Sequence, residues 1–419
     1  MFVDNTKRKR ELGLLLITAV IVAVGFIVVA YMNTIKPLDV IMFILVYIGI
    51  FATLHLFLQA QSHIGDQLLL PIIGCLVAVG LVFLFRLRPS LLPYQLLWCI
   101  TGALGFYVVT RLFRSPEILQ KYKYVSGILG ILLILSTVLF GVDIGGNKSW
   151  LIIGPLRFEP SEFAKILLVI FLAGYLAEHR VLLTTNKWRV GKYSLPHPLY
   201  LGPLLALWGI GLLLLVLEKD LGAALLYYST FLTMLYIASG RRSYVVIGLV
   251  LIIMGGIFSY YIFGHVRIRF DMWLNPWSDP DGRGYQIVQA LFSLATGGIF
   301  GTGLSLGRPD YIPAVHTDFV FAAMGEELGL VGTLAVLLLF VLLIHRGFRA
   351  ALVTKNQFCC LMAAGFSSLL ALQTLVIIGG VTKFLPLTGI TLPFISYGGS
   401  SMLSNFLIVG LLHNISEKR

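Results

Sequence analysis

The stretch Pro313-Ala-Val-His-Thr-Asp-Phe-Val-Phe-Ala-Ala-Met-Gly-Glu-Glu327 leads from a long polar segment into an apolar helix that is predicted to start at Phe319. It places Asp318 at the mouth of that helix, and Glu326 and Glu327 about 12 Å further along the helix axis. Acids within a lipid-buried segment are costly and usually face a protein or water cavity, so they indicate a functional site. The alternative is that Asp318 only caps the helix N-terminus, where a carboxylate accepts hydrogen bonds from unpaired N–H groups.

The composition indicates a membrane protein with many spans. Of the 419 residues, 58% are hydrophobic and only 12% are charged, which excludes an ordinary soluble domain of this length. The net charge of +12 comes from lysines and arginines scattered in short loops, which favours a role in membrane topology over nucleic-acid binding. The four cysteines have neither metal-binding nor redox spacing.

Twelve apolar runs are long enough to span a bilayer, so the predicted fold is an all-α polytopic membrane protein with about twelve transmembrane helices. The runs cover residues 12–31, 38–60, 67–85, 93–112, 124–141, 160–177, 199–217, 221–239, 244–263, 319–344, 357–380 and 396–415.

The loops predict the orientation. The basic cluster Lys7–Arg10 precedes an apolar run with no clean cleavage site after it, which we interpret as an uncleaved first helix. With this cluster in the cytoplasm, an even number of helices puts both termini there, together with the larger share of the lysines and arginines. The polar segments 142–159 and 264–318 then face the outside. The second is predicted to be a functional extracellular loop with a short interfacial helix within Gly284–Leu291.

Four outward-facing patches could carry chemistry. The first is Arg157–Lys165, where Glu162 and Lys165 are three residues apart and can pair on one helix face, either as a structural ion pair or as part of a site. The second is Glu218-Lys-Asp-Leu-Gly222, the third is the long loop that ends at Asp318, and the fourth is Lys383–Ser400. The prolines and glycines of the fourth patch are typical of a broken or re-entrant helix, which survives at membrane depth only where it lines a cavity or is buried in protein.

Several cations lie on the side that the orientation rule disfavours, and an anionic ligand such as a lipid pyrophosphate would explain them. Arg157 and Arg308 are examples, although ordinary surface charge accounts for some of these cations. A lone histidine such as His316 is more often structural than metal-binding. The sequence contains no nucleotide-binding loop and no metalloprotease or serine-hydrolase motif, so nothing indicates an ATP-driven pump.

Taken together, these patches resemble the RodA/FtsW/SpoVE (SEDS) family of bacterial peptidoglycan polymerases, from about residue 67 to the end. Two departures are informative. Lys219 stands where the family often has proline, and Pro386-Leu-Thr-Gly389 lacks the lysine of the FtsW type, which favours the RodA-like branch. The residues that carry the resemblance are Asn147-Lys-Ser-Trp-Leu151, Gly154, Glu159-Pro-Ser-Glu162, Lys165, Glu218-Lys-Asp-Leu-Gly222, Asn275-Pro-Trp277, Gly284-Tyr-Gln286, Ala314-Val-His-Thr-Asp-Phe-Val-Phe321, Gly325-Glu-Glu-Leu-Gly329 and Leu392-Pro-Phe-Ile-Ser-Tyr-Gly-Gly-Ser-Ser401.

The resemblance implies a family core of ten helices over residues 67–419, preceded by a two-helix extension over residues 1–66. It implies inverting glycosyl transfer between lipid II and the growing glycan strand at the outer face of the bacterial cytoplasmic membrane, for cell elongation and shape or for division. Asp318 would be the catalytic base, and a divalent cation, Mg²⁺ or Mn²⁺, could assist. Lys165, Arg157 and Arg308 would stabilise the leaving pyrophosphate. The side chains expected to line the substrate site are Arg157, Glu162, Lys165, Asp220, Arg308, His316, Glu326, Glu327, Ser396 and Tyr397.

The implied partners are lipid II and a class B penicillin-binding protein, a transpeptidase, with no nucleic acid. Two other classes stay open at this point. A flippase or transporter for the same lipid carrier would also use intramembrane charges and broken helices. A structural scaffold for division or elongation proteins would leave the buried acids unexplained.

Overall fold

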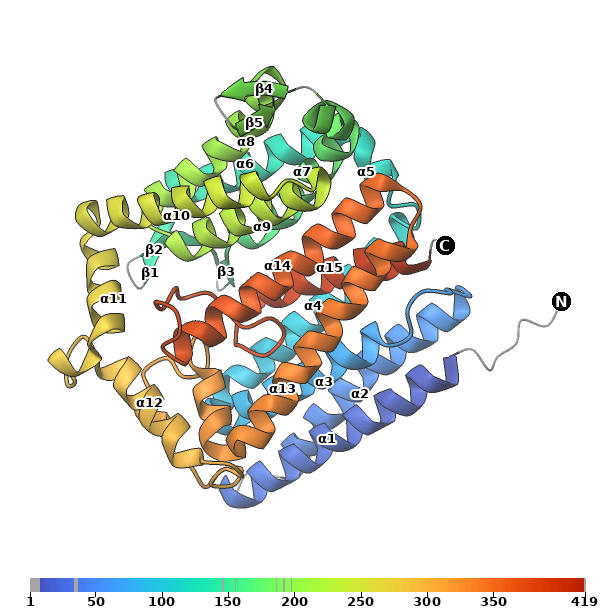
Figure 1. The fold of residues 1–419 in the computed structure, drawn as a ribbon. Coiled ribbons are helices and arrows are strands. Elements are labelled where there is room, and N and C mark those ends of the chain that lie inside the picture. Colours follow the sequence, from blue (N-terminus) through green and yellow to red (C-terminus); the bar gives the residue numbers. More distant parts are fainter. Residues whose placement is uncertain are drawn as a thin grey trace. The chain divides into compact units, whose positions relative to one another are not determined.

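The protein is described here from a computed structural model, which covers residues 8–33, 37–144, 147–154, 156–185, 187–190, 193–196 and 198–417. Lys7, at the start of the basic N-terminal cluster, lies outside the described residues. Helices dominate the fold (Figure 1). In chain order the elements are α1 (Lys9–Asn33), α2 (Pro37–Ala60), α3 (Leu69–Leu87), η2 (Pro89–Leu91), α4 (Leu92–Leu112), α5 (Ile118–Lys121), α6 (Lys123–Phe140), β1 (Val142–Ile144), β2 (Asn147–Ile153), β3 (Leu156–Phe158), α7 (Ser161–Thr185), β4 (Lys187–Val190), β5 (Tyr193–Pro196), α8 (Pro198–Leu217), α9 (Leu221–Ser239), α10 (Arg242–Ile262), α11 (Gly264–Leu274), η3 (Pro276–Ser278), α12 (Tyr285–Gly297), η4 (Pro309–Tyr311), α13 (Val320–Val353), α14 (Gln357–Val381) and α15 (Gly399–Glu417).

Each of the twelve predicted apolar runs coincides with a helix, which confirms the all-α polytopic class. Within the described part of the chain, nine helices are long and apolar enough to cross a membrane. Over Gly202–Leu217, α8 is apolar but shorter, and α7 and α15 are not among the nine. The number of twelve spans therefore stays a prediction.

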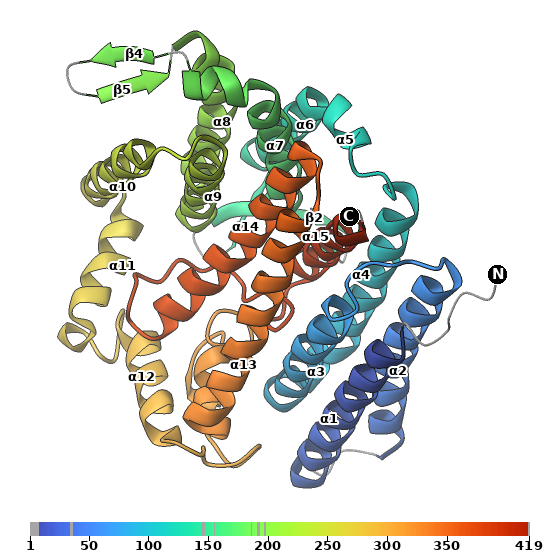
Figure 2. The ribbon, with the colours of Figure 1, turned by 45° about the vertical axis from the view of Figure 1, so that its right-hand side comes forward.

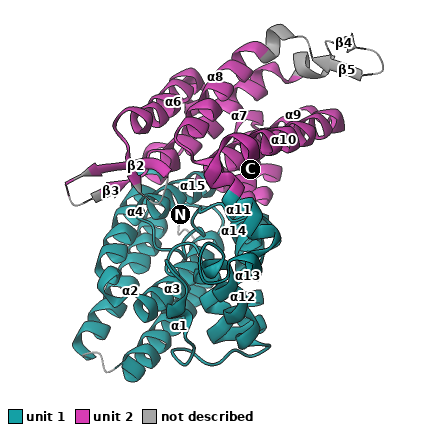
Figure 3. Cartoon of the chain, turned by 90° about the vertical axis from the view of Figure 1, so that its left-hand side faces the viewer, with its two compact units in different colours: residues 1–109, 268–346, 373–413 teal, residues 110–267, 347–372, 414–419 magenta. Residues whose placement is uncertain are grey.

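The chain folds as two compact units (Figure 3). The first comprises residues 1–109, 268–346 and 373–413, and the second comprises residues 110–267, 347–372 and 414–419. In the first unit, α1 packs against α2 and α3 (Figure 2). The division into a two-helix extension and a core starting at residue 67 stays a prediction.

A buried ion network fixes the start of α1 to the first unit. Arg8 donates two hydrogen bonds to the carboxylate of Glu11, at 3.0 and 2.9 Å, and two to the carbonyl oxygen of His63, at 3.2 and 2.8 Å. His55 Nδ1, on α2, lies 2.6 Å from Glu11 Oε1. Because all of these groups are buried and mutually partnered, the charges are tolerated inside an apolar helix pair.

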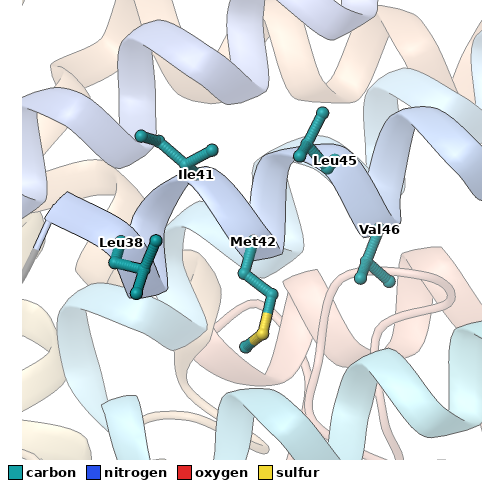
Figure 4. Close-up of a pocket in the computed structure, with 5 residues that line it drawn as sticks. All are labelled: Leu38, Ile41, Met42, Leu45 and Val46. Carbon is teal, nitrogen blue, oxygen red and sulfur yellow. The ribbon is translucent and has the colours of Figure 1, made fainter.

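The outer side of α2 is apolar as well. Leu38, Ile41, Met42, Leu45 and Val46 line a shallow pocket of about 370 Å³ on this helix (Figure 4). Apolar side chains on both faces of a helix are typical of contact with lipid. We therefore assign this surface to the bilayer.

In the second unit, α7 packs against α6, α8 and α9. In the same unit, the described residues of the polar segment 142–159 form a small antiparallel sheet in the order β1-β2-β3. Trp150 pairs with Val142, and Ile152 pairs with Arg157. Beneath the sheet, the apolar core of the unit comprises Ile134, Ala164, Leu168, Leu215, Ala223, Ala224 and Tyr227.

The predicted loop over residues 264–318 contains two α-helices. One is α12, which confirms the predicted short helix and extends it to Gly297. The other, α11, was not predicted, since its sequence is polar and only Met272 among its residues is buried.

Helix α13 is interrupted at Gly329, whose φ of +67° is a left-handed conformation that glycine tolerates. The segment 298–303 pairs the backbone groups freed by this break. Its amides donate to the carbonyl oxygens of Glu326 and Glu327, and its carbonyls accept from the first two amides after Gly329, at 2.9–3.1 Å. Full pairing is what allows an irregular backbone inside an apolar helix.

Candidate active site

Asp318 lies in the turn before α13, and its side chain is partly exposed. Burial raises the pKa of this carboxyl from its ordinary value of 3.8 to about 6, against a hydrogen bond from Thr317 and the nearby charge of Arg269, which lower it. No described hydrogen bond makes Asp318 the cap of α13, and the helix begins two residues later. An acid with a pKa near neutral and access to solvent can exchange protons at physiological pH.

Arg269 and Gly389 complete the surroundings of Asp318 in the first unit. Arg269, on α11, donates from Nη1 to the carbonyl oxygen of Thr388 at 3.0 Å. Gly389 has a φ of +78°, and a side-chain carbon added to it would lie 3.8 Å from Asp318 Oδ2 and 3.6 Å from Arg269 Nη2. Because glycine has no side chain, no methyl group occupies this position beside the carboxylate and the guanidinium. Neither Arg269 nor Gly389 was predicted, because nothing in the local sequence links them to Asp318.

Ser396 and Tyr397 hold the backbone that carries Asp318. Ser396 Oγ donates to the carbonyl oxygen of Thr317 at 2.5 Å and accepts from the amide of Leu392 at 3.0 Å. The amide of Tyr397 donates to the carbonyl oxygen of His316 at 3.0 Å. The structure thus brings three predicted residues together with Asp318, and the contacts made by Ser396 and by the Tyr397 amide position the backbone.

His316 lies beside Tyr397, with ring centroids 6.0 Å apart. Burial and the positive charge of Arg88 lower the pKa of His316, so its imidazole is neutral at pH 7. Ala314, two residues earlier, has a φ of +52°, a strained conformation for a residue with a side chain. Such strain persists only where the surroundings impose it, and here the amide of Thr317 donates to the carbonyl oxygen of Ala314 at 3.1 Å and Gln286 Nε2 donates to that of Pro313 at 2.9 Å.

The side chains of Glu326 and Glu327 bind a neighbouring loop and do not face an open space. Glu327 accepts from Arg86 Nε at 3.1 Å and from the amide of Ser305 at 3.0 Å, and Glu326 Oε1 accepts from the amide of Arg308 at 2.6 Å. Both glutamates are buried. These contacts favour a structural role for both glutamates, and their predicted place in the substrate site stays a prediction. The side chain of Arg308 is exposed.

The second unit holds the remaining predicted residues. Lys165 Nζ lies 2.5 Å from Glu162 Oε2, which confirms that the two residues pair, and Lys165 is buried. Asp220 caps α9, because its Oδ1 accepts from the amide of Ala223 at 3.0 Å. Arg157 is exposed on β3.

Glu159, which belongs to the quoted motif but was not predicted as a site residue, joins this cluster. Burial and the neighbouring carboxylates of Glu162 and Asp220 raise its pKa well above the ordinary value, despite a hydrogen bond from Ser161 Oγ at 3.1 Å and the charge of Lys165. The spacing Glu159-Pro-Ser-Glu162 was the available signal. Glu159 was not predicted as a site residue because it precedes the helix.

The described residues include no group of three or more His, Cys, Asp or Glu side chains arranged to hold a metal ion. The Mg²⁺ or Mn²⁺ that the resemblance allowed stays a prediction, since such an ion is usually held by one or two carboxylates together with the phosphates of the substrate.

Lys219 has a φ of +63°. Proline cannot adopt this angle, since its ring holds φ near −65°. The turn between α8 and α9 therefore differs in backbone conformation from one with proline at this position.

Comparison with known proteins gives a consistent result. Residues 67–419 match the FtsW/RodA/SpoVE family, described as "Cell cycle protein". The chain is 43% identical over 426 residues to "Peptidoglycan glycosyltransferase RodA" of Mycobacterium tuberculosis, covering 98% of this chain and 91% of that protein.

Two solved structures share the fold. A chain from a study of "polymerization and crosslinking by a peptidoglycan synthase complex" is 28% identical with a TM-score of 0.69, covering 84% of this chain and 97% of the other. The rod shape-determining protein RodA of Thermus thermophilus is 27% identical with a TM-score of 0.61, covering 84% of this chain and 96% of the other. This chain belongs to the FtsW/RodA/SpoVE family of bacterial membrane proteins.

Proposed function

We propose that this chain polymerises peptidoglycan by transferring the growing glycan strand from its lipid carrier to lipid II, for cell elongation and shape or for division. The predicted class, peptidoglycan glycosyltransferase, is supported by relatives with that name, the first of them covering almost the whole chain. The single observation that carries the mechanism is the partly exposed carboxyl of Asp318, with a pKa of about 6, beside Gly389, which has no side chain.

In this mechanism the 4-hydroxyl of lipid II attacks the anomeric carbon of the growing strand. A new C–O bond forms, the bond from that carbon to the pyrophosphate oxygen breaks, and the configuration inverts. The Asp318 carboxylate takes the proton of the hydroxyl, and undecaprenyl pyrophosphate leaves with the electron pair. A base of pKa about 6 is mostly ionised at pH 7 and still accepts a proton efficiently in the transition state.

The cations differ in their suitability for the leaving pyrophosphate. Lys165 is buried and paired with Glu162, whereas the guanidinium of Arg157 is exposed and could bind phosphate oxygens bidentately. We therefore assign the pyrophosphate contact to Arg157 and to Arg308, whose side chain is also exposed, and a supporting role to Lys165.

The remaining parts of the proposal concern the partner and the orientation. The similarity to a chain of a peptidoglycan synthase complex supports a class B penicillin-binding protein as partner. The loop charges support cytoplasmic termini and an active site outside the cytoplasmic membrane.

The test is polymerisation of lipid II by the purified full chain, with and without the transpeptidase partner. Asp318→Asn is expected to lower the rate at least about 100-fold, since general-base catalysis contributes about 10²–10⁴. Asp281→Asn makes the same chemical change at an exposed loop position and should leave the rate unchanged. A wild-type chain that is inactive even with its partner, or an active Asp318→Asn variant, would contradict the proposal. Lipid translocation, the activity of a flippase, would be measured next.

A further inference from the structure

The turn between α8 and α9 contains a buried acid that the mechanism does not use. Glu218 is only 1% exposed and joins three parts of the second unit. Its carbonyl oxygen accepts from the amide of Lys148 on β2 at 3.1 Å, and its side chain contacts the Thr137 hydroxyl near the end of α6. Lys148 Nζ also donates to the carbonyl oxygen of Val138 at 2.9 Å, so the same turn of α6 contacts both β2 and Glu218.

The contacts of Thr137 bear on the protonation of Glu218. A hydroxyl has one hydrogen to donate, and Thr137 Oγ1 lies 2.6 Å from the carbonyl oxygen of Ile134, which can only accept. Thr137 Oγ1 also contacts Glu218 Oε1, so its one hydrogen is shared between two acceptors unless a protonated carboxyl group supplies a second one. The other oxygen, Oε2, is buried and has no hydrogen-bond partner among the described residues, an arrangement that is costly for a carboxylate.

The charges around Glu218 agree with a neutral acid. Asp220 in the same turn is an acid, Tyr227 on α9 faces the group, and Lys148 on β2 is the nearby cation. Burial raises the pKa of Glu218 to about 8, opposed by the Thr137 hydrogen bond, with a further rise from Asp220 and a reduction from Lys148. The protonated form is therefore the main one at pH 7.

We propose that Glu218 is a positioning residue that works in its protonated form: its side chain holds the α8–α9 turn against α6, so that its carbonyl oxygen stays on the Lys148 amide of β2 and the β1–β3 sheet keeps Arg157 and Glu159 in place. Arg157 lies on β3, which pairs with β2, and Glu159 follows directly after β3. Loss of the proton creates a second negative charge beside Asp220 in a buried turn, and the contact between the Glu218 side chain and α6 weakens. The inference deepens the proposed glycosyl transfer and rests on it.

The pH profile of polymerisation tests this inference. The wild type should show a bell-shaped profile, rising through about pH 6 as Asp318 ionises and falling at about pH 8 as Glu218 ionises. Glu218→Gln keeps a neutral hydrogen-bond donor, so its rate at pH 7 should stay within twofold of the wild type while the fall at alkaline pH disappears. Asp143→Asn, an exposed acid on β1, is the matched control and should keep the fall. An unchanged alkaline fall in Glu218→Gln, or a folded Glu218→Gln chain that is inactive at every pH, would overturn the inference.

Two further measurements separate this inference from the polymerase assignment. Infrared difference spectra of wild type and Glu218→Gln at pH 7 should show a protonated carboxyl C=O band that only the wild type has, whether or not the chain polymerises lipid II. The absence of this band overturns the inference alone. At Thr137, serine keeps the hydroxyl and valine removes it, so Thr137→Ser should retain the wild-type rate and Thr137→Val should lose at least fivefold. Equal rates for the two variants also count against the inference.

Discussion

Two acids of the first unit, Glu11 and Asp318, differ in their partners. Glu11 is completely buried, accepts two hydrogen bonds from Arg8 and contacts His55 at 2.6 Å. Asp318 is partly exposed, with a Thr317 hydrogen bond and Arg269 nearby, and its pKa is raised to about 6. A buried acid whose charge is fully balanced by cations and hydrogen bonds has a structural role. An acid whose charge is only partly balanced and that reaches solvent can take part in chemistry.

The largest expected effect on stability is at Glu11. Glu11→Gln leaves Arg8 buried without its counter-charge, which is expected to cost about 3–5 kcal/mol of unfolding free energy. Thermal unfolding in detergent measures this loss. Asp39→Asn, at an exposed position in the first turn of α2, should behave like the wild type. A Glu11→Gln chain as stable as the wild type would show that the network is not the attachment of α1.

Asp318→Asn should change stability in the opposite direction. The folded-state pKa of Asp318 is raised above its ordinary value, so the wild type is favoured at low pH and loses stability as the pH rises from about 4 through about 6. The neutral asparagine avoids this loss and should be more stable at pH 7, by up to about 3 kcal/mol and by less if solvent screens the site.

The measurement is thermal unfolding of wild type and Asp318→Asn at several pH values. The difference between them should grow between pH 4 and pH 7. A difference that is independent of pH would show that the carboxyl titrates normally and would remove the basis for assigning it as the base.

The smallest expected stability effect tests the space in front of Asp318. Gly389→Ala introduces a left-handed alanine, costing about 1–2 kcal/mol, and places a methyl group near Asp318 and Arg269. Polymerisation should fall more than this stability loss explains, because substrate would have to share the space with the methyl group. Gly398→Ala, in the same segment but with ordinary φ and ordinary contacts, is the matched control. Equal activity of the two variants would mean that the space is not used.

The sequence alone determined the features that depend on neighbouring residues. Long apolar runs predict membrane-spanning helices because a segment of that length and composition is stable in lipid. Glu162 and Lys165 pair because a spacing of three residues places both side chains on one helix face. Asp318 could be identified because an acid at the start of an apolar helix is energetically costly and usually has a function.

The tertiary structure decided what depends on residues far apart in the chain. Arg269 and Gly389 reach Asp318 from α11 and from the segment before α15, and Arg86 reaches Glu327 from α3. The proposed proton on Glu218 likewise depends on a tertiary contact, since Thr137 lies 81 residues earlier in the chain. Burial and hydrogen-bond partners set the charge state of an acid, and both are properties of the packed chain rather than of any single stretch.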